Sequence, residues 1–327
     1  MRRELMPTLG RPSVERLRST ILIPAVDEVL GSVDADIGTK DRHVVEFMSQ
    51  VAVKVPYAMI TRLLGLPPAD AAWLRTRVLP LAGAMEFPAS SSSLSMALDA
   101  KSELIDYLKE TIGKRRPGDD ETFLDFLVPR DQPVDEAALS FVTLFMLGAT
   151  ETSVAAIGKV LYAVLANDVE LSALANAEYR MQVIRETLRL EPPTHTIVRY
   201  ASTDLELHGV EIPRRSTLLL SLGSASRDET IFSDPDTWRP GRPDQRLLAF
   251  SAGPHTCLGA QLALAEFDML FDRLAARFAG IQRTDAMEDV RSGLWRLRER
   301  GHVFRQPDKL HVELLRHSEQ AESRTNA

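Results

Sequence analysis

The sequence predicts a mainly α-helical protein with a small region of β-sheet. Over the first two thirds of the 327 residues, apolar side chains recur at the three- and four-residue spacing of amphipathic helices. The last third changes to short apolar runs separated by turn residues, a pattern typical of short strands. Hydrophobic residues make up 44% of the chain, which is enough to bury a large core.

Proline and glycine mark the expected ends of the early helices. Gly65-Leu-Pro67 follows the second helix, Pro80 lies just beyond the third, and Pro117-Gly118 stops the fourth. A polar, serine-rich loop that starts at Phe87 separates the third helix from the fourth. These four helices are expected over residues 14–33, 45–64, 69–79 and 94–116.

The centre of the chain contains the longest expected helix. Asp135 is a good N-cap residue, and the following stretch, 136–166, is apolar on most of its faces. We therefore expect a buried central helix. A further helix over 178–190 ends before Pro192, and short strands are expected over 205–207, 210–212 and 217–220.

Composition narrows the classes of function and the location. The net charge of −7, with no long basic run, argues against nucleic acid as a partner. No apolar stretch approaches the roughly 20 uninterrupted residues of a membrane-spanning helix, and the N-terminus lacks the apolar core of a secretion signal. We expect a cytoplasmic protein without a membrane partner, with one domain over 1–316 and a disordered tail over 317–327.

The only cysteine, Cys257, is the most informative residue. A single cysteine cannot form an internal disulfide, so packing, catalysis and metal ligation remain as its roles. It lies in the run Phe250-Ser-Ala-Gly-Pro-His-Thr-Cys-Leu-Gly259, directly before an apolar helical segment. A helix N-terminus favours the thiolate, which is the form that ligates metals. A small buried hydrophobic residue would explain neither the glycines nor the histidine.

The spacing Phe-x-x-Gly-x-His-x-Cys-x-Gly resembles the haem-binding signature of the cytochrome P450 family of haem-thiolate monooxygenases. The resemblance implies that Cys257 is the axial ligand of haem b (iron protoporphyrin IX). It also implies that Phe250 packs beneath the macrocycle and that Gly253 lets the loop approach the ring. His255 would reach a haem propionate, and Gly259 completes the signature.

The central helix contains Gly148-Ala-Thr-Glu-Thr-Ser153, which resembles the oxygen-activation motif of the same family. The resemblance implies that Glu151 is the acid and Thr152 the alcohol that deliver protons to bound O2. Ala149 stands where the family usually has glycine. From the residues alone, a buried helix whose threonines bond to backbone carbonyls is the alternative.

Arginines form the remaining candidate site residues. Glu186-Thr-Leu-Arg189 places two opposite charges on one helix face, which alone fits an ordinary ion pair. The resemblance implies a structural triad with Arg242. It also implies that Arg199 and Arg2 neutralise haem propionates, although a solvated arginine at the start of a strand is the alternative for Arg199.

The resemblance covers residues 2 to about 315 in consistent order, and family members have further elements before this point. It implies a cytochrome P450 fold that lacks its N-terminal part. The implied activity is that of a haem-dependent monooxygenase, which uses O2 to oxidise a hydrophobic small-molecule substrate. A ferredoxin or other redox partner protein would supply electrons, because the chain has no flavin or nicotinamide fingerprint. The alternatives are a truncated relative that binds haem without catalysis and an all-α scaffold without a cofactor.

Overall fold

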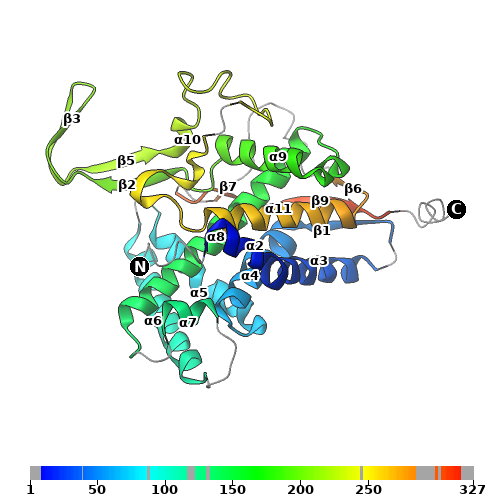
Figure 1. Ribbon diagram of the computed structural model, residues 1–327, viewed down its shortest axis with the longest axis horizontal. Coiled ribbons are helices and arrows are strands. Elements are labelled where there is room, and N and C mark those ends of the chain that lie inside the picture. Colours follow the sequence, from blue (N-terminus) through cyan, green and yellow to red (C-terminus); the bar gives the residue numbers. More distant parts are fainter. Residues whose placement is uncertain are drawn as a thin grey trace.

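The long helix α8, Glu136–Ala166, runs through the middle of the helical part of the protein (Figure 1). The computed structural model describes residues 9–38, 40–86, 89–115, 122–129, 133–243, 246–284, 299–300 and 303–317. The Asp135 carboxylate accepts a hydrogen bond from the amide of Ala137 and so caps the first turn of α8. Every residue from Ser153 to Leu165 is buried, as expected for a helix that is apolar all round.

Most of the other helices pack around α8 or against one another, and their apolar side chains join a continuous core. The other helices are α2 (Arg11–Leu17), α3 (Ile23–Ile37), α4 (Lys54–Leu64), α5 (Ala71–Ala84), α6 (Ser91–Gly113), α7 (Phe123–Leu127), α9 (Ala177–Leu190), α10 (Leu222–Ala225) and α11 (Ala260–Arg277). The short α10 packs instead on the strand β2 (Thr196–Tyr200) and on the 3-10 turn Leu248–Phe250. Single π-helical turns lie at Arg18–Leu22 and Met48–Ala52. Short 3-10 turns lie at Pro68–Asp70, Leu171–Ala175, Leu248–Phe250 and Gly253–His255.

All of the strands described pair antiparallel. The largest sheet has the order β1-β9-β6, formed by Arg42–Glu46, His311–Leu315 and Gly280–Arg283. A ribbon of β2 (Thr196–Tyr200) and β5 (Thr217–Ser221) continues into β3 (Leu205–Leu207) and β4 (Val210–Ile212), which project away from the helices (Figure 1). β7 (Glu299–Arg300) pairs with β8 (Gln306–Pro307).

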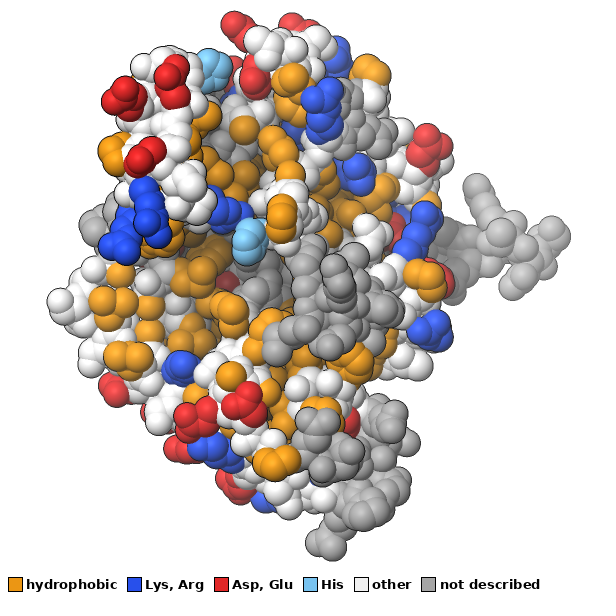
Figure 2. Space-filling view, turned by 60° about the vertical axis from the view of Figure 1, so that its left-hand side comes forward, with side chains coloured by type: hydrophobic (Ala, Val, Ile, Leu, Met, Phe, Trp, Pro, Cys, Tyr) orange, Lys and Arg blue, Asp and Glu red, His pale blue; other side chains and the backbone are white. Residues whose placement is uncertain are grey.

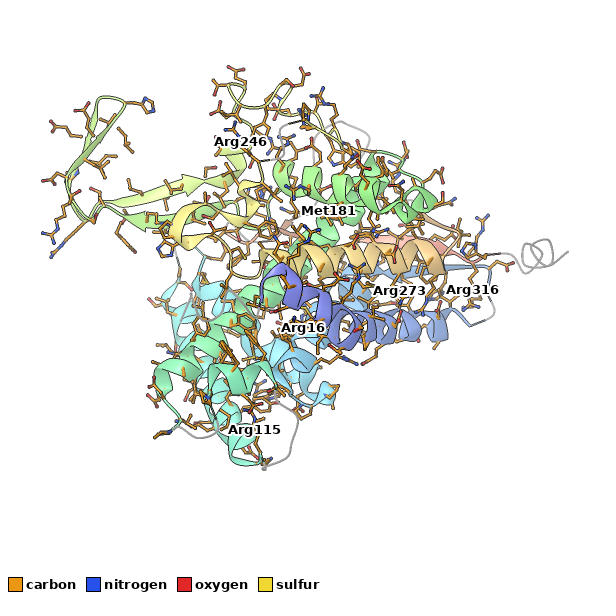
Figure 3. All side chains as sticks on the ribbon, in the orientation of Figure 1. Arg16, Arg115, Met181, Arg246, Arg273 and Arg316 are labelled. Atoms are coloured by element: carbon orange, nitrogen blue, oxygen red, sulfur yellow. The ribbon has the colours of Figure 1, made fainter. Side chains whose placement is uncertain are left out.

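Ion pairs link α3 to α11 and to the end of β9. Arg273 of α11 lies 3.6 Å from Asp27 of α3, measured from Nε to Oδ1. Arg316, just after β9, lies 3.8 Å from Asp34 at the other end of α3. Both arginines are labelled in Figure 3. These pairs are partly exposed, so each contributes little stability compared with the apolar core.

The predicted fold class is confirmed, and α8 has the predicted bounds. The prediction of a helix over 45–64 was wrong at its start, because residues 42–46 form β1. Pairing with β9, more than 260 residues away, satisfies the backbone there and buries Val45. Pro80 was predicted to lie beyond its helix but lies inside α5, which continues to Ala84 with Leu74, Val78 and Ala82 buried.

Some expectations concern residues that lie outside the described ranges. They are the stop at Pro117-Gly118, the start of the serine-rich loop at Phe87 and Pro88, and residues 318–327 of the tail. Among the residues that are described, α8 alone is long and apolar enough to cross a membrane. Because 67% of that stretch is buried inside the protein, it is placed as a core helix.

Candidate functional site

A cavity of about 370 Å³ lies between α8 and the loop that contains Cys257. Gly148, Ala149 and Thr152 line it from α8. The opposite wall is formed by the predicted loop residues Phe250, His255, Cys257 and Gly259. The structure therefore brings together, at one cavity, two motifs that are about 100 residues apart in the sequence. The volume is within the range of small-molecule and cofactor sites, about 300–1,000 Å³.

The cysteine loop is built from two short turns and is held by its own backbone. The amide of Cys257 donates a hydrogen bond of 2.8 Å to the carbonyl of Phe250, and the amide of Thr256 donates one of 3.1 Å to that of Gly253. Gly253 has a φ of +72° and Ser251 a φ of +59°. Two left-handed residues within three positions make a tight, strained loop of the kind found at functional sites.

The role predicted for Gly253 can now be stated in terms of backbone conformation. Apart from its chain neighbours, no atom of the described residues would lie within 4 Å of a Cβ added there, so none of these atoms demands the glycine. Its positive φ does, since residues with a Cβ atom rarely adopt that conformation. The side chain of Cys257 is exposed in this arrangement, at the edge of the cavity.

The residues around the cavity fit an apolar cofactor that contains a metal. Most of the lining is aliphatic or aromatic, and Cys257 supplies the one thiol among the described residues. His255 is the only basic side chain in that lining. Arg199 does not line the cavity, and its guanidinium donates instead to the carbonyl of Val198. Arg2 lies outside the described residues.

Glu151 and Thr152 face different sides of α8. Consecutive residues of an α-helix are rotated by about 100°, and here that rotation places Thr152 in the lining of the cavity and Glu151 outside it. Thr152 lines the cavity, and its Oγ1 donates a hydrogen bond of 2.7 Å to the carbonyl of Gly148. Glu151 is buried on another face, where it accepts a hydrogen bond of 2.8 Å from the hydroxyl of Tyr57. Burial raises the pKa of Glu151, and the Tyr57 hydroxyl and the Arg75 charge only partly oppose this effect.

Glu266 of α11 is a cavity residue that the sequence reasoning missed. It is 1% exposed, and its Oε2 accepts a hydrogen bond of 2.9 Å from the hydroxyl of Ser153. Burial raises the pKa of Glu266 to about 8, although the Ser153 hydroxyl acts in the opposite direction. The available signal was a carboxylate beside Leu262, Phe267 and Leu270 on the apolar face of an amphipathic helix.

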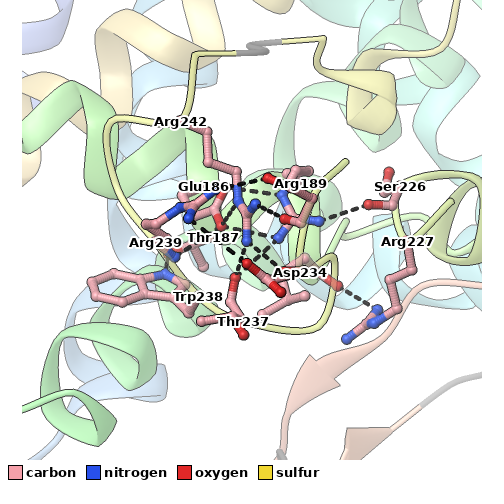
Figure 4. A network of polar contacts seen from close by, with 12 residues as sticks. Glu186, Thr187, Arg189, Ser226, Arg227, Asp234, Thr237, Trp238, Arg239 and Arg242 are labelled. Carbon is pink, nitrogen blue, oxygen red and sulfur yellow. Dashed lines mark hydrogen bonds and ion pairs between the residues drawn. The ribbon is translucent and has the colours of Figure 1, made fainter. Parts of the chain in front are cut away.

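The three residues of the predicted triad meet in the structure (Figure 4). Glu186 Oε1 accepts a hydrogen bond of 2.7 Å from Arg242, and both of its oxygens accept from Arg189 at 2.9 Å. Arg242 also donates to three backbone carbonyls between residues 233 and 237. Burial alone would raise the pKa of Glu186, but the hydrogen bonds from both arginines outweigh burial and lower it.

Comparisons with known proteins agree with this geometry. The family model for Cytochrome P450 matches residues 163–293. Cytochrome P450-SOY of Streptomyces griseus is 29% identical over 295 residues, which cover 89% of this chain and 68% of that protein. The biotin biosynthesis cytochrome P450 of Bacillus subtilis (strain 168) is 28% identical over 244 residues, which cover 73% of this chain and 62% of that protein.

The chain belongs to the cytochrome P450 family. It spans about two thirds of the length of the curated relatives that it matches. Members of the family use haem b.

Solved cytochrome P450 structures share the fold. CYP164A2 of Mycobacterium smegmatis has a TM-score of 0.81 and 28% identity, with 95% of this chain and 78% of that chain covered. P450BioI, solved with a hexadec-9Z-enoic acid ligated acyl carrier protein, has a TM-score of 0.82 and 25% identity. That match covers 97% of this chain and 78% of the P450BioI chain.

Proposed function

We propose that this chain is a haem-dependent monooxygenase that oxidises a hydrophobic small molecule with O2. The observation that carries the proposal is the placement of Cys257 across one apolar cavity from Thr152 of α8. In this proposal residues 1–316 act as one domain in the cytoplasm, with no nucleic acid or membrane partner. A ferredoxin-type partner protein supplies the electrons.

Four loop residues would hold the cofactor. The Cys257 sulfur would ligate the iron, with Phe250 packed nearby and Gly259 at the start of α11. His255, the basic side chain of the lining, would face an acidic edge of the cofactor. When bound, haem supplies the activation of O2, which no amino-acid side chain provides.

The residues of α8 would manage protons and exclude water. While Thr152 Oγ1 donates to the carbonyl of Gly148, its lone pairs remain able to accept a hydrogen bond from a group in the cavity. Rotation of the hydroxyl proton would turn the same atom into a donor. Glu151 would bring protons from solvent to this position.

The class of substrate follows from the lining. Phe141, Leu144 and Phe145 of α8 and Ile197 of β2 give the cavity apolar walls. Hydrophobic side chains also gather in and around a hollow on the face that bears the β2–β5 ribbon (Figure 2). These surfaces favour a hydrophobic substrate, since they offer few hydrogen-bonding partners.

The absorption spectrum of the reduced, CO-bound protein tests the proposal. We expect the spectrum of a thiolate-ligated haem, its loss in Cys257→Ser, and its retention in the control Thr152→Ala. Absence of haem binding in the unmodified chain, or an unchanged spectrum in Cys257→Ser, would contradict the ligand assignment. A thiolate spectrum without O2-dependent oxidation of any apolar substrate would instead identify a relative that binds haem without catalysis.

A further inference from the structure

We propose that Tyr57, which lines a second cavity, is a positioning residue that holds Glu151 on that side of α8, from which protons are carried across α8 to the cavity beside Cys257. This inference rests on the proposed function, because it assigns a route for the protons which that function consumes. Tyr57 lies on α4, and nothing in the sequence motifs points to it.

The contact between the two side chains is direct and buried. The Tyr57 hydroxyl donates a hydrogen bond of 2.8 Å to Glu151 Oε1. Tyr57 is 2% exposed and Glu151 is 4% exposed. Burial and the neighbouring Glu151 carboxylate raise the pKa of Tyr57, so its hydroxyl keeps its proton and acts as a donor throughout.

The second cavity lies on the Tyr57 side of α8. It measures about 480 Å³ and is lined by residues of α3, α4 and α5, including Tyr57. Its charged lining residues are Glu28, Lys54, Arg62 and Arg75. A cavity of this size with several charged walls holds water. The buried Nε–H of Arg75 has no hydrogen-bond acceptor among the described residues, which marks a place for such a water.

The groups that lower the pKa of Glu151 come from two elements. Tyr57 of α4 donates the hydrogen bond, and Arg75 of α5 contributes its positive charge. Glu28, Lys54 and Arg62 line the same cavity, and Arg62 pairs with Glu28. No other ionisable group contributes to the shifted pKa of Glu151 in the part of the chain described.

The transfer balances as a shuttle of one proton. Water that reaches Glu151 from the second cavity, past Tyr57, gives a proton to the carboxylate, and the hydroxide left behind takes up a proton from bulk solvent. The carboxylic acid no longer accepts strongly from Tyr57, because a neutral acid is the weaker hydrogen-bond acceptor. Its side chain then turns and releases the proton to a water or to the Thr152 hydroxyl. The carboxylate returns to Tyr57, so the two residues end as they began.

Tyr57→Phe tests the inference because it removes only the donor. We expect the pKa of Glu151 to rise by about 1–2 pH units, the effect of losing one hydrogen bond to a charged group. Infrared titration of the carboxyl group measures this shift with or without haem, and its Glu151 signal is identified by subtraction of the Glu151→Gln spectrum. The pH profile of O2 reduction by the haem-loaded protein at an electrode should move to higher pH by the same amount.

Two comparisons separate positioning from a structural role. The matched control is Tyr107→Phe on α6, which removes the hydroxyl donor to Asp70 and should leave the pKa of Glu151 unchanged. In the Glu151→Gln background, Tyr57→Phe should have no further effect on the pH profile. Tyr57→Gln retains an N–H donor, so the pKa of Glu151 in this variant should stay closer to its value in the unmodified protein than in Tyr57→Phe.

Three results would overturn the inference. They are an unchanged Glu151 titration in Tyr57→Phe, an equal effect of that substitution in the Glu151→Gln background, and an equal shift in Tyr57→Gln and Tyr57→Phe. Failure of the proposed function gives a different result, namely loss of the thiolate-type CO spectrum in the unmodified protein. The infrared titration does not depend on that spectrum.

Discussion

Glu151 and Glu266 are both buried beside α8, and their neighbours give them different properties. Glu151 has a hydroxyl donor and a guanidinium charge nearby, which limit the rise in its pKa. Glu266 has only the Ser153 hydroxyl, so burial raises its pKa to about 8. At neutral pH Glu266 therefore retains its proton and is buried without an uncompensated charge.

Replacement of Glu266 by Gln should change how stability depends on pH. Between pH 4.5, the ordinary pKa of a glutamate, and about 8, the folded protein holds a proton that the unfolded chain has released. Stability therefore falls as pH rises through this interval, by up to about 1.4 kcal/mol per pH unit. Glu266→Gln removes this loss. The free energy of unfolding of the variant, measured in urea, should therefore rise relative to that of the unmodified protein from pH 5 to pH 8.

The exposed Glu206 of β3 provides the control for that experiment. Glu206→Gln should follow the pH dependence of the unmodified protein. If the free energies of unfolding of Glu266→Gln and of the unmodified protein differ by the same amount over the whole interval, Glu266 is ionised in the folded protein.

Residue-level prediction succeeded where the signal was local. Phe250, His255, Cys257 and Gly259 line one cavity because a loop of ten residues fixes their spacing. The directions of side chains on a buried helix could not be predicted from the motif. Thr152 reaches the cavity, whereas the preceding residue contacts α4, and this depends on how α8 is rotated against its neighbours.

At the scale of elements, α8 is the helix on which the site depends, and its neighbours determine which of its positions tolerate a larger residue. Gly158 lies where α8 crosses the π-helical turn at Met48–Ala52 and the strand β8. An added Cβ at Gly158 would lie 2.5 Å from Met48 Sδ and 3.1 Å from Pro307 Cγ. At Gly148, beside the cavity, an added Cβ would meet no atom of the described residues within 4 Å beyond the helix's own backbone.

The same substitution should therefore have opposite effects at these two glycines. Alanine is the better helix former by about 1 kcal/mol, so Gly148→Ala should raise the free energy of unfolding by up to that amount. At Gly158, overpacking costs about 1–3 kcal/mol and should outweigh the gain. Urea unfolding of the two variants measures the difference, and equal stabilisation of both would show that Met48 and Pro307 move aside freely.

Elements were predictable where their pattern is long and self-contained. The bounds of α8 follow from an N-cap residue and the 31 apolar-rich positions after it. β1 was not predicted because its five residues form a strand by pairing with β9, which lies near the other end of the chain. The order β1-β9-β6 likewise has no local signal.

At the scale of the whole molecule, the Glu186 network joins the helical body to the irregular segment before the cysteine loop. Glu186 and Arg189 belong to α9, whereas Arg242 and the carbonyls that it contacts belong to that segment (Figure 4). The side chains of Glu186, Arg189 and Arg242 are at most 4% exposed. Loss of Glu186 would leave two buried guanidinium charges without their carboxylate, whereas loss of Arg242 would remove one buried ion pair and the donor to three backbone carbonyls.

Arg242→Ala should lower the free energy of unfolding by about 3–5 kcal/mol, the usual cost of breaking a buried ion pair. The neighbouring Arg239 is a matched control, since its side chain is 45% exposed and lies 3.9 Å from a largely exposed Asp234. Arg239→Ala should cost less than about 1 kcal/mol. Equal losses in urea unfolding would mean that the network does not hold this segment.

The position of the one thiol also allows its chemical modification to report whether the cavity is occupied. Cys257 is the only cysteine of the 327 residues, and its side chain is exposed at the edge of the cavity. A thiol-specific reagent can therefore modify a single known atom, and any ligand that covers that atom slows the modification. The mass of the intact chain after a timed alkylation thus counts the molecules whose cavity is filled, even for ligands that have no colour.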